Sequence, residues 1–143
     1  MDRSFHYLQM ATQSLFQRSV MAELNGSGLT AGQPKVLDYL GRHDGSVQKD
    51  IAAGCQIDPA TLTGVLNRME EKGLIRRCNE DGNRRSLHVY LTEQGWDKQR
   101  EVRQTMERQS EAVQAGLSEE QRAQLLDCLY KVCANMTDME GLQ

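Results

Sequence analysis

The side chains best suited to chemistry lie on one face of a helix predicted to begin at Asp58-Pro59 and end at Gly73. At 100° per residue, the arc opposite its apolar stripe holds small or hydrogen-bonding residues instead of long charged ones. They are Ala60, Thr63, Gly64, Asn67 and Glu71, flanked by Thr61 and Arg68. Amide, guanidinium and hydroxyl groups of this kind pair with base edges in a major groove. Taken alone, the face is equally consistent with simple exposure to solvent.

Arginines gather in the segment that follows this helix. The periodicity changes there from helical to alternating, and the Asp-Gly turn signal within residues 79–83 predicts a two-stranded hairpin. Arg76 and Arg77 lie on one strand, and Arg84 and Arg85 follow the turn. A basic hairpin beside a recognition helix is typical of a wing that reaches into a minor groove. The alternative is an edge strand protected from aggregation by charge.

Helical periodicity and capping signals predict five further helices around these two elements. They cover residues 4–24, a stretch from a Thr30–Gln33 capping box past Leu40, residues 46–53 capped by Ser46, residues 92–115 capped by Thr92, and a stretch from a Ser118–Gln121 capping box onward. The expected fold is therefore mainly α with a small β-hairpin. We expect one domain over residues 1–143, with a winged helix-turn-helix core at 29–91. The helices in 1–28 and 92–143 carry apolar stripes that need a partner, which predicts a homodimer.

The composition places the chain among ordinary soluble proteins, with 38% hydrophobic and 26% charged residues. The formal net charge of -3 argues mildly against nucleic acid, but a duplex responds to the local cluster within a Debye length of about 10 Å. The chain lacks the pattern of a signal peptide and any apolar run long enough to span a membrane. We therefore expect a cytoplasmic protein without membrane contact.

From Leu29 to Gly95, about half of the chain, the sequence resembles the multiple antibiotic resistance regulator (MarR) family. The motifs that carry the resemblance follow in the family's order and spacing: Leu29-Thr30 with Gln33 and Val36-Leu37, Gln48 with Ile51-Ala52, Asp58-Pro59-Ala60-Thr61-Leu62-Thr63, Leu66, Arg68 through Arg77, Asn83-Arg84-Arg85-Ser86, and Leu91 through Gly95. Each motif is weak alone, whereas their combination is specific.

The resemblance implies a homodimer that binds a pseudo-palindromic DNA operator, usually as a repressor released by a small ligand or by thiol oxidation. The family's wing motif is Asp-x-Arg, which corresponds here to Asn83 and Arg85, so the acid is missing. The position of Gly64 is often polar or basic in the family. The expected DNA-contacting residues are Gln48, Ala60, Thr61, Thr63, Gly64, Asn67, Arg68, Arg76, Arg84 and Arg85.

The sequence gives weaker evidence for how the protein is regulated. A small aromatic or lipophilic effector would bind between the dimer helices and the winged region, where Tyr7, Phe16 and Tyr39 could supply aromatic walls, although such residues are more often core. Cys78, near the wing, is the candidate redox residue, and Cys55 is expected to be structural. The scattered histidines predict no metal site, and no cofactor is expected.

Two other functional classes are alternatives to DNA binding. An enzyme would need a nucleophile with its base, an acid–base pair or a phosphate-binding glycine loop, and the sequence offers none of these. A winged helix that serves only as a protein-interaction module would suit the acidic balance. Salt dependence separates that module from a DNA-binding regulator, because phosphate contacts weaken steeply as salt rises.

Overall fold

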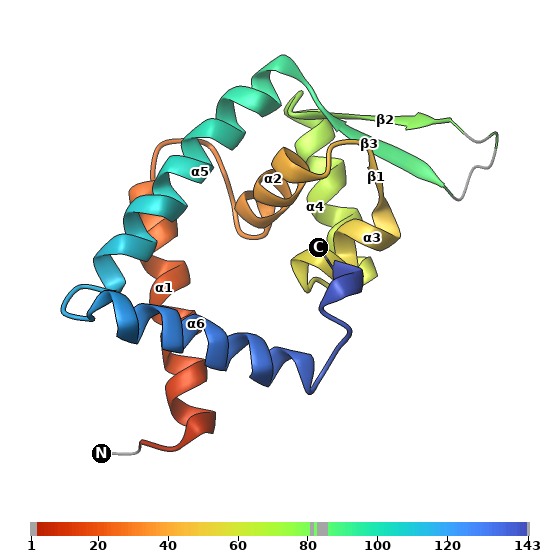
Figure 1. Cartoon of the computed structure of the whole chain (residues 1–143). Helices are drawn as coiled ribbons and strands as arrows, with labels where there is room; N and C mark the ends of the chain where they lie inside the picture. Colours follow the sequence, from red (N-terminus) through yellow and green to blue (C-terminus); the bar gives the residue numbers. More distant parts are fainter. Residues whose placement is uncertain (1–2, 81, 83–85, 143) are drawn as a thin grey trace.

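The computed structural model describes residues 3–80, 82 and 86–142, which form six α-helices, three short β-strands and a final 3-10 turn (Figure 1). In chain order these are α1 (Phe5–Glu23), α2 (Gln33–Arg42), β1 (Ser46–Val47), α3 (Gln48–Cys55), α4 (Pro59–Glu71), β2 (Ile75–Asn79), β3 (Leu87–Leu91), α5 (Glu93–Val113), α6 (Glu119–Ala134) and η1 (Glu140–Leu142). The predicted fold class, mainly α with a small β element, is confirmed.

Most predicted helix starts are confirmed by their capping bonds. The hydroxyl of Ser4 accepts a hydrogen bond from the first turn of α1, and that of Thr92 accepts one from the N–H of Gly95 in α5. Ser118 and Gln121 form a complete capping box at α6, with both side chains bonded to each other's backbone N–H. Gly73 follows α4 with a φ of 74°, the left-handed geometry expected of a glycine just past a helix end.

Two predicted caps are wrong. Gln33 Oε1 does accept from the Thr30 N–H, but the Gln33 N–H donates to the Thr30 carbonyl, and α2 begins after Gly32. The Thr30 hydroxyl therefore caps nothing in α2. Ser46 lies in β1, where its hydroxyl donates to the His43 carbonyl, and α3 begins one residue after Val47.

The sheet has three strands in the described part of the chain, in the order β1–β3–β2, and every neighbouring pair is antiparallel. The sequence predicted the hairpin of β2 and β3 but missed β1, the third strand of the sheet. In β1, Val47 pairs with His88, which attaches the segment between α2 and α3 to β3, the central strand of the sheet. At the other side, the Thr92 N–H donates to the Leu74 carbonyl at 3.1 Å. The hairpin is therefore held at its root by the Thr92–Leu74 bond and along β3 by β1.

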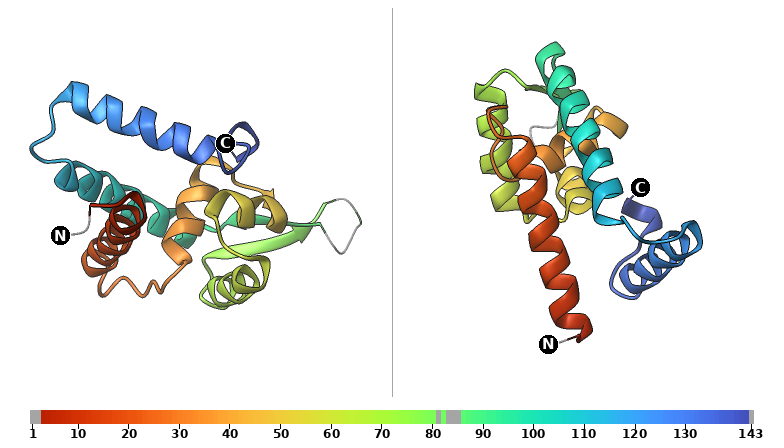
Figure 2. Two further views of the ribbon diagram at one scale, coloured as in Figure 1. Left: turned by 90° about the horizontal axis from the view of Figure 1, so that it is seen from below. Right: turned by 90° about the vertical axis from the view of Figure 1, so that its left-hand side faces the viewer.

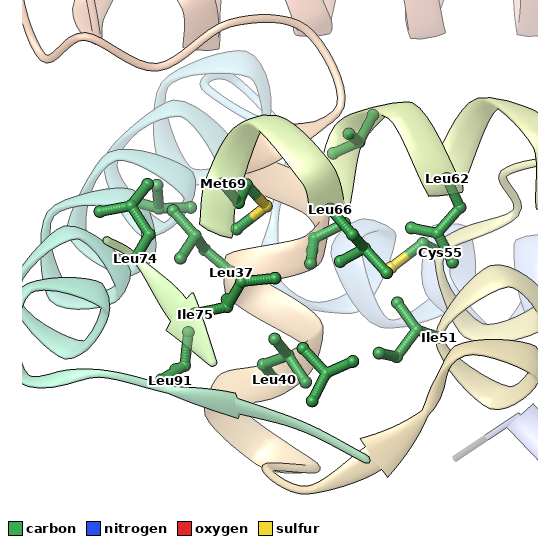
Figure 3. Close-up of a cluster of buried hydrophobic side chains, with 14 of the residues drawn as sticks. Leu37, Leu40, Ile51, Cys55, Leu62, Leu66, Met69, Leu74, Ile75 and Leu91 are labelled. Atoms are coloured by element: carbon green, nitrogen blue, oxygen red, sulfur yellow. The ribbon is translucent and has the colours of Figure 1, made fainter. Parts of the chain in front are cut away.

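The hydrophobic core lies where α2, α3 and α4 meet the sheet (Figure 3). The predicted stripe of α4, formed by Leu62, Val65, Leu66 and Met69, is buried, and the helix packs against α3, β2 and α2. Burying a side chain of this size contributes about 1.5–3 kcal/mol. The stripe thereby fixes which face of α4 points outward.

The helices at the two chain ends behave differently from this core. α1 packs against α5, while α6 contributes no buried residue and stands apart from the winged region (Figure 2). Large apolar side chains of these end segments remain exposed: Phe5, Tyr7, Leu8, Met10, Leu15, Leu117, Leu125, Leu126, Leu129, Tyr130 and Met136. Among the described residues, none of the helices combines the length and apolarity that a membrane crossing requires.

Candidate nucleic-acid interface

The N-terminus of α4 is built around Asp58. Its Oδ1 accepts from the N–H groups of Ala60 at 3.0 Å and Thr61 at 3.2 Å, and its Oδ2 accepts from the Thr61 hydroxyl. These hydrogen bonds, chiefly those from Thr61, hold the pKa of Asp58 below its usual value. Pro59 occupies the first helical position, where its missing N–H leaves no donor unsatisfied. The carboxylate thus sets the start of the helix and the rotamer of Thr61.

The outward face of α4 carries the predicted side chains. Ala60, Thr61, Thr63, Asn67 and Arg68 are exposed, and Gly64 is half-buried. The Thr63 hydroxyl donates to the Pro59 carbonyl at 3.0 Å, as the Thr61 hydroxyl does to Asp58. The hydroxyl hydrogens of both threonines are therefore used in hydrogen bonds within the protein. These residues offer lone pairs and methyl groups to a ligand, which suits base edges better than acceptor-only phosphate oxygens.

Arg77 is a further functional candidate, expected in the hairpin but not among the predicted DNA-contacting residues. Its Nε and Nη2 donate to the two carboxylate oxygens of Glu70 at 3.2 and 3.1 Å. The same guanidinium donates to Asn67 Oδ1 at 2.8 Å and to Gln48 Oε1 at 3.4 Å. The hydrogen bonds from Arg77 also lower the pKa of Glu70. One arginine of β2 thus joins the start of α3 to the outward face of α4.

Arg76 lies on the opposite face of the sheet. It pairs with Tyr90, whereas Arg77 pairs with the buried Val89, so the two arginines point to different sides. The Arg76 guanidinium stacks on the Tyr90 ring at 4.6 Å and contacts Cys78 Sγ at 2.8 Å. The structure therefore does not bring Arg76 together with the α4 face. The sequence could have predicted this separation, because successive residues of a strand point to opposite faces of the sheet.

The remaining predicted wing residues lie outside the described part of the chain. Asn83, Arg84 and Arg85 fall there, so their placement stays a prediction. The described hairpin reaches to the pair formed by Asn79 and Leu87, and its strands extend away from the helices (Figure 1).

The three aromatic candidates do not share one site. Tyr39 lines a hollow of about 550 Å³ with Lys35, Arg42 and His43, and Phe16 lines two neighbouring hollows. Met106 borders all three of these spaces. Tyr7 lines neither the hollow beside Tyr39 nor the two beside Phe16, and it is 43% exposed.

Cys55 and Cys78 differ in burial, and Cys55 is buried as a structural cysteine would be. Its thiol is buried and donates to the Lys35 carbonyl at 3.5 Å, and burial raises its pKa to about 11. A thiol that stays protonated at neutral pH is a poor nucleophile. Cys78 is half-buried on β2 beside Arg76.

Comparisons with known proteins agree with this architecture. A sequence model described as the MarR family matches residues 27–86. The HTH-type transcriptional repressor MdtR of Bacillus subtilis is 30% identical over 104 residues, which span 71% of this chain and 67% of that protein. The chain belongs to the MarR family. Its function as a DNA-binding transcriptional regulator, predicted from the sequence, follows from this membership.

Solved structures of transcriptional regulators share this fold over nearly all of the chain. The transcriptional regulator SlyA has a TM-score of 0.83 at 26% identity, with 94% of each chain covered. MepR of S. aureus, solved as a DNA complex, has a TM-score of 0.82 at 25% identity, with 95% of this chain and 100% of that chain covered. The similarity therefore extends beyond the winged region to the end helices.

Proposed function

We propose that this MarR-family regulator is a homodimer that represses transcription by occupying a two-fold symmetric operator, with α4 in the major groove. The observation that carries the proposal is the outward face of α4, where exposed small and hydrogen-bonding side chains stand on a helix anchored by a buried stripe. The helix-turn-helix geometry places its second helix, here α4, in the groove. The hairpin beside it is the expected minor-groove element, with Arg84 and Arg85 as its cations.

The apolar faces of α1 and α6 support a second copy of the chain as the partner. α6 buries none of its residues within the chain, although Leu126 is 60% exposed and Leu129 is 47% exposed. Monomeric soluble proteins rarely leave extended apolar surface of this kind uncovered. Two-fold symmetry would set the two α4 helices about 34 Å apart, one turn of duplex.

The hollow beside Tyr39 is the best-supported effector site. Its volume of about 550 Å³ lies within the usual range for small-molecule pockets. Lys35, Arg42 and His43 provide cationic or protonatable groups, of which Arg42 pairs with the lining carboxylate of Asp38. Tyr39 and Met106 provide apolar walls, and Lys35 leaves an excess of positive charge. This lining favours a small aromatic anion. Cys78 is the second regulatory candidate, since it is half-buried near the wing and its sulfur contacts the Arg76 guanidinium.

The test combines selection of duplexes from a random pool with sedimentation. We expect one enriched two-fold symmetric sequence, bound by a dimer, with affinity that falls steeply as salt rises. Arg85→Ala should weaken binding to all sequences, and Asn67→Ala should weaken binding to the selected sequence more than to random duplex. Arg100→Ala, which removes an exposed α5 arginine paired with Asp97 on its own helix, is the control. A monomer, or a chain with no preferred sequence, would refute the proposal.

The regulatory sites are tested on the same selected duplex. Small aromatic carboxylates are titrated against the complex, with Arg42→Ala as the variant expected to lose the response. Peroxide treatment is compared between the native chain and Cys78→Ser. Unchanged operator binding after peroxide would remove Cys78 from consideration.

A further inference from the structure

We propose that Arg77 is a positioning residue that turns the amides of Asn67 and Gln48 so that their NH2 groups face the DNA and favour guanine in the operator. The inference deepens the proposed function and rests on it. Its basis is the single guanidinium that contacts Asn67 Oδ1, Gln48 Oε1 and both oxygens of Glu70. Three elements, α3, α4 and β2, meet at this group.

The orientation of both amides follows from the chemistry of arginine. A guanidinium carries only N–H donors, so it contacts an amide favourably through the amide oxygen alone. At 2.8 Å from Asn67 and 3.4 Å from Gln48, Arg77 therefore selects the rotamer in which each oxygen points to the sheet. The Nδ2 of Asn67 and the Nε2 of Gln48 are then left on the side away from Arg77.

Glu70 holds the guanidinium in place. The two parallel hydrogen bonds between Arg77 and Glu70 form a bidentate pair, whose geometry is more specific than that of a single bond. The Arg77 side chain is only 17% exposed, against 43% for Glu70. Because the charge of Arg77 is matched by a carboxylate and four of its five N–H donors are used in these contacts, Arg77 is a poor phosphate anchor. Its role is to shape the neighbouring amides.

The base that these two side chains favour follows from the NH2 donors that they present to the major groove. Guanine offers two adjacent acceptors in the major groove, N7 and O6, whereas the usual contact of asparagine with adenine also needs the amide oxygen to accept from N6. The oxygen of Asn67 is directed to Arg77, so the bidentate adenine contact is disfavoured. Donors from Asn67 and Gln48 then match guanine better than adenine.

Asn67→Asp tests this assignment without disturbing the contact to Arg77. One carboxylate oxygen can replace the amide oxygen toward the guanidinium, while the other replaces the outward donor with an acceptor. The preference at the facing base pair should then shift from guanine to cytosine, whose N4 amino group is a donor, by about tenfold in the ratio of affinities. The ratio is measured within each variant, so a uniform loss of affinity from the added negative charge cancels.

Arg77→Lys is the second variant, with Arg100→Lys as the matched control. A lysine keeps the charge but cannot reach Glu70, Asn67 and Gln48 together, so base preference should flatten by about tenfold. The dependence of affinity on salt should stay as in the native chain, because no phosphate contact is lost. If the Arg77→Lys chain does not fold, Asn67→Asp decides the question alone.

Two results would overturn the inference, and they are distinct from failure of the proposed function. The first is a native chain that selects an operator whose base preferences are unchanged by Asn67→Asp. The second is a folded Arg77→Lys chain that keeps those preferences or loses one phosphate-sized increment of salt dependence. A native chain that selects no sequence at all would instead refute the regulator proposal itself.

Discussion

Gly64 lies in the middle of α4, and replacing it with alanine should stabilise the protein. Gly64 has helical backbone geometry, because it is not among the residues with positive φ. An added Cβ would meet only the flexible end of Arg68, whose Nη1 is 3.5 Å away, an ordinary van der Waals contact. Nothing in the described structure therefore opposes a methyl group at this position.

The magnitude follows from helix propensity. Glycine in a helix interior is about 0.8–1 kcal/mol less favourable than alanine, because it loses more backbone freedom on folding. For a chain of this size, a gain of that order raises the melting temperature by about 2–4 °C. The measurement is thermal unfolding by calorimetry at one fixed protein concentration, since the Tm of an oligomer depends on concentration.

Gly95→Ala is the matched control, because the same methyl group should have the opposite effect. Gly95 lies in the first turn of α5, where an added Cβ would overlap the carbonyl oxygen of Leu74. Neither the first turn of α5 nor the start of the sheet can shift cheaply, so the melting temperature should fall. A Gly64→Ala protein that melts lower than the native chain, or two variants that shift in the same direction, would refute the reasoning.

Three further predictions concern pH, capping and assembly. Because burial raises the pKa of Cys55 from 9.0 to about 11, the thiol should cost roughly 2 kcal/mol of stability as pH rises from 9 to 11, a loss that Cys55→Ala removes in denaturant titrations. Asp58→Ala should lower the melting temperature while Asp58→Asn, which keeps the cap, should not. Because the pKa of Asp58 is lowered on folding, the native chain should be more stable than Asp58→Ala at neutral pH, and this difference in stability should shrink in acid as Asp58 is protonated. Leu126→Glu should shift sedimentation toward the monomer, whereas Gln124→Glu on the same helix should leave the dimer intact.

The sequence was sufficient to predict α4. An aspartate before a proline, an apolar stripe at helical spacing and a glycine at the end all specify the same helix, and local signals that agree are the reliable ones. The outward face of α4 followed from the same pattern, because burying one stripe exposes its opposite. The starts of α5 and α6 were predicted for the same reason.

Features that depend on distant residues were missed. β1 is two residues long and has no periodicity, so only its pairing with β3 reveals it. The cap at Ser46 failed because that residue was recruited into the strand. Arg77 was recognised as basic, but its contacts to Gln48 and Glu70 arise from the packing of three elements. Of this arrangement, the sequence could have predicted only that Arg76 and Arg77 point to opposite faces of the sheet.

The two attachments of the hairpin have a consequence for how such proteins diversify. β1 grips one edge of the hairpin, and the Thr92–Leu74 bond ties the end of β3 to the start of β2. Insertions or deletions between Asn79 and Leu87 would therefore leave the register of the root and the seat of α4 intact. Tips of different length and charge could be grafted onto one scaffold, and a regulator could acquire new flanking-sequence contacts without refolding its centre.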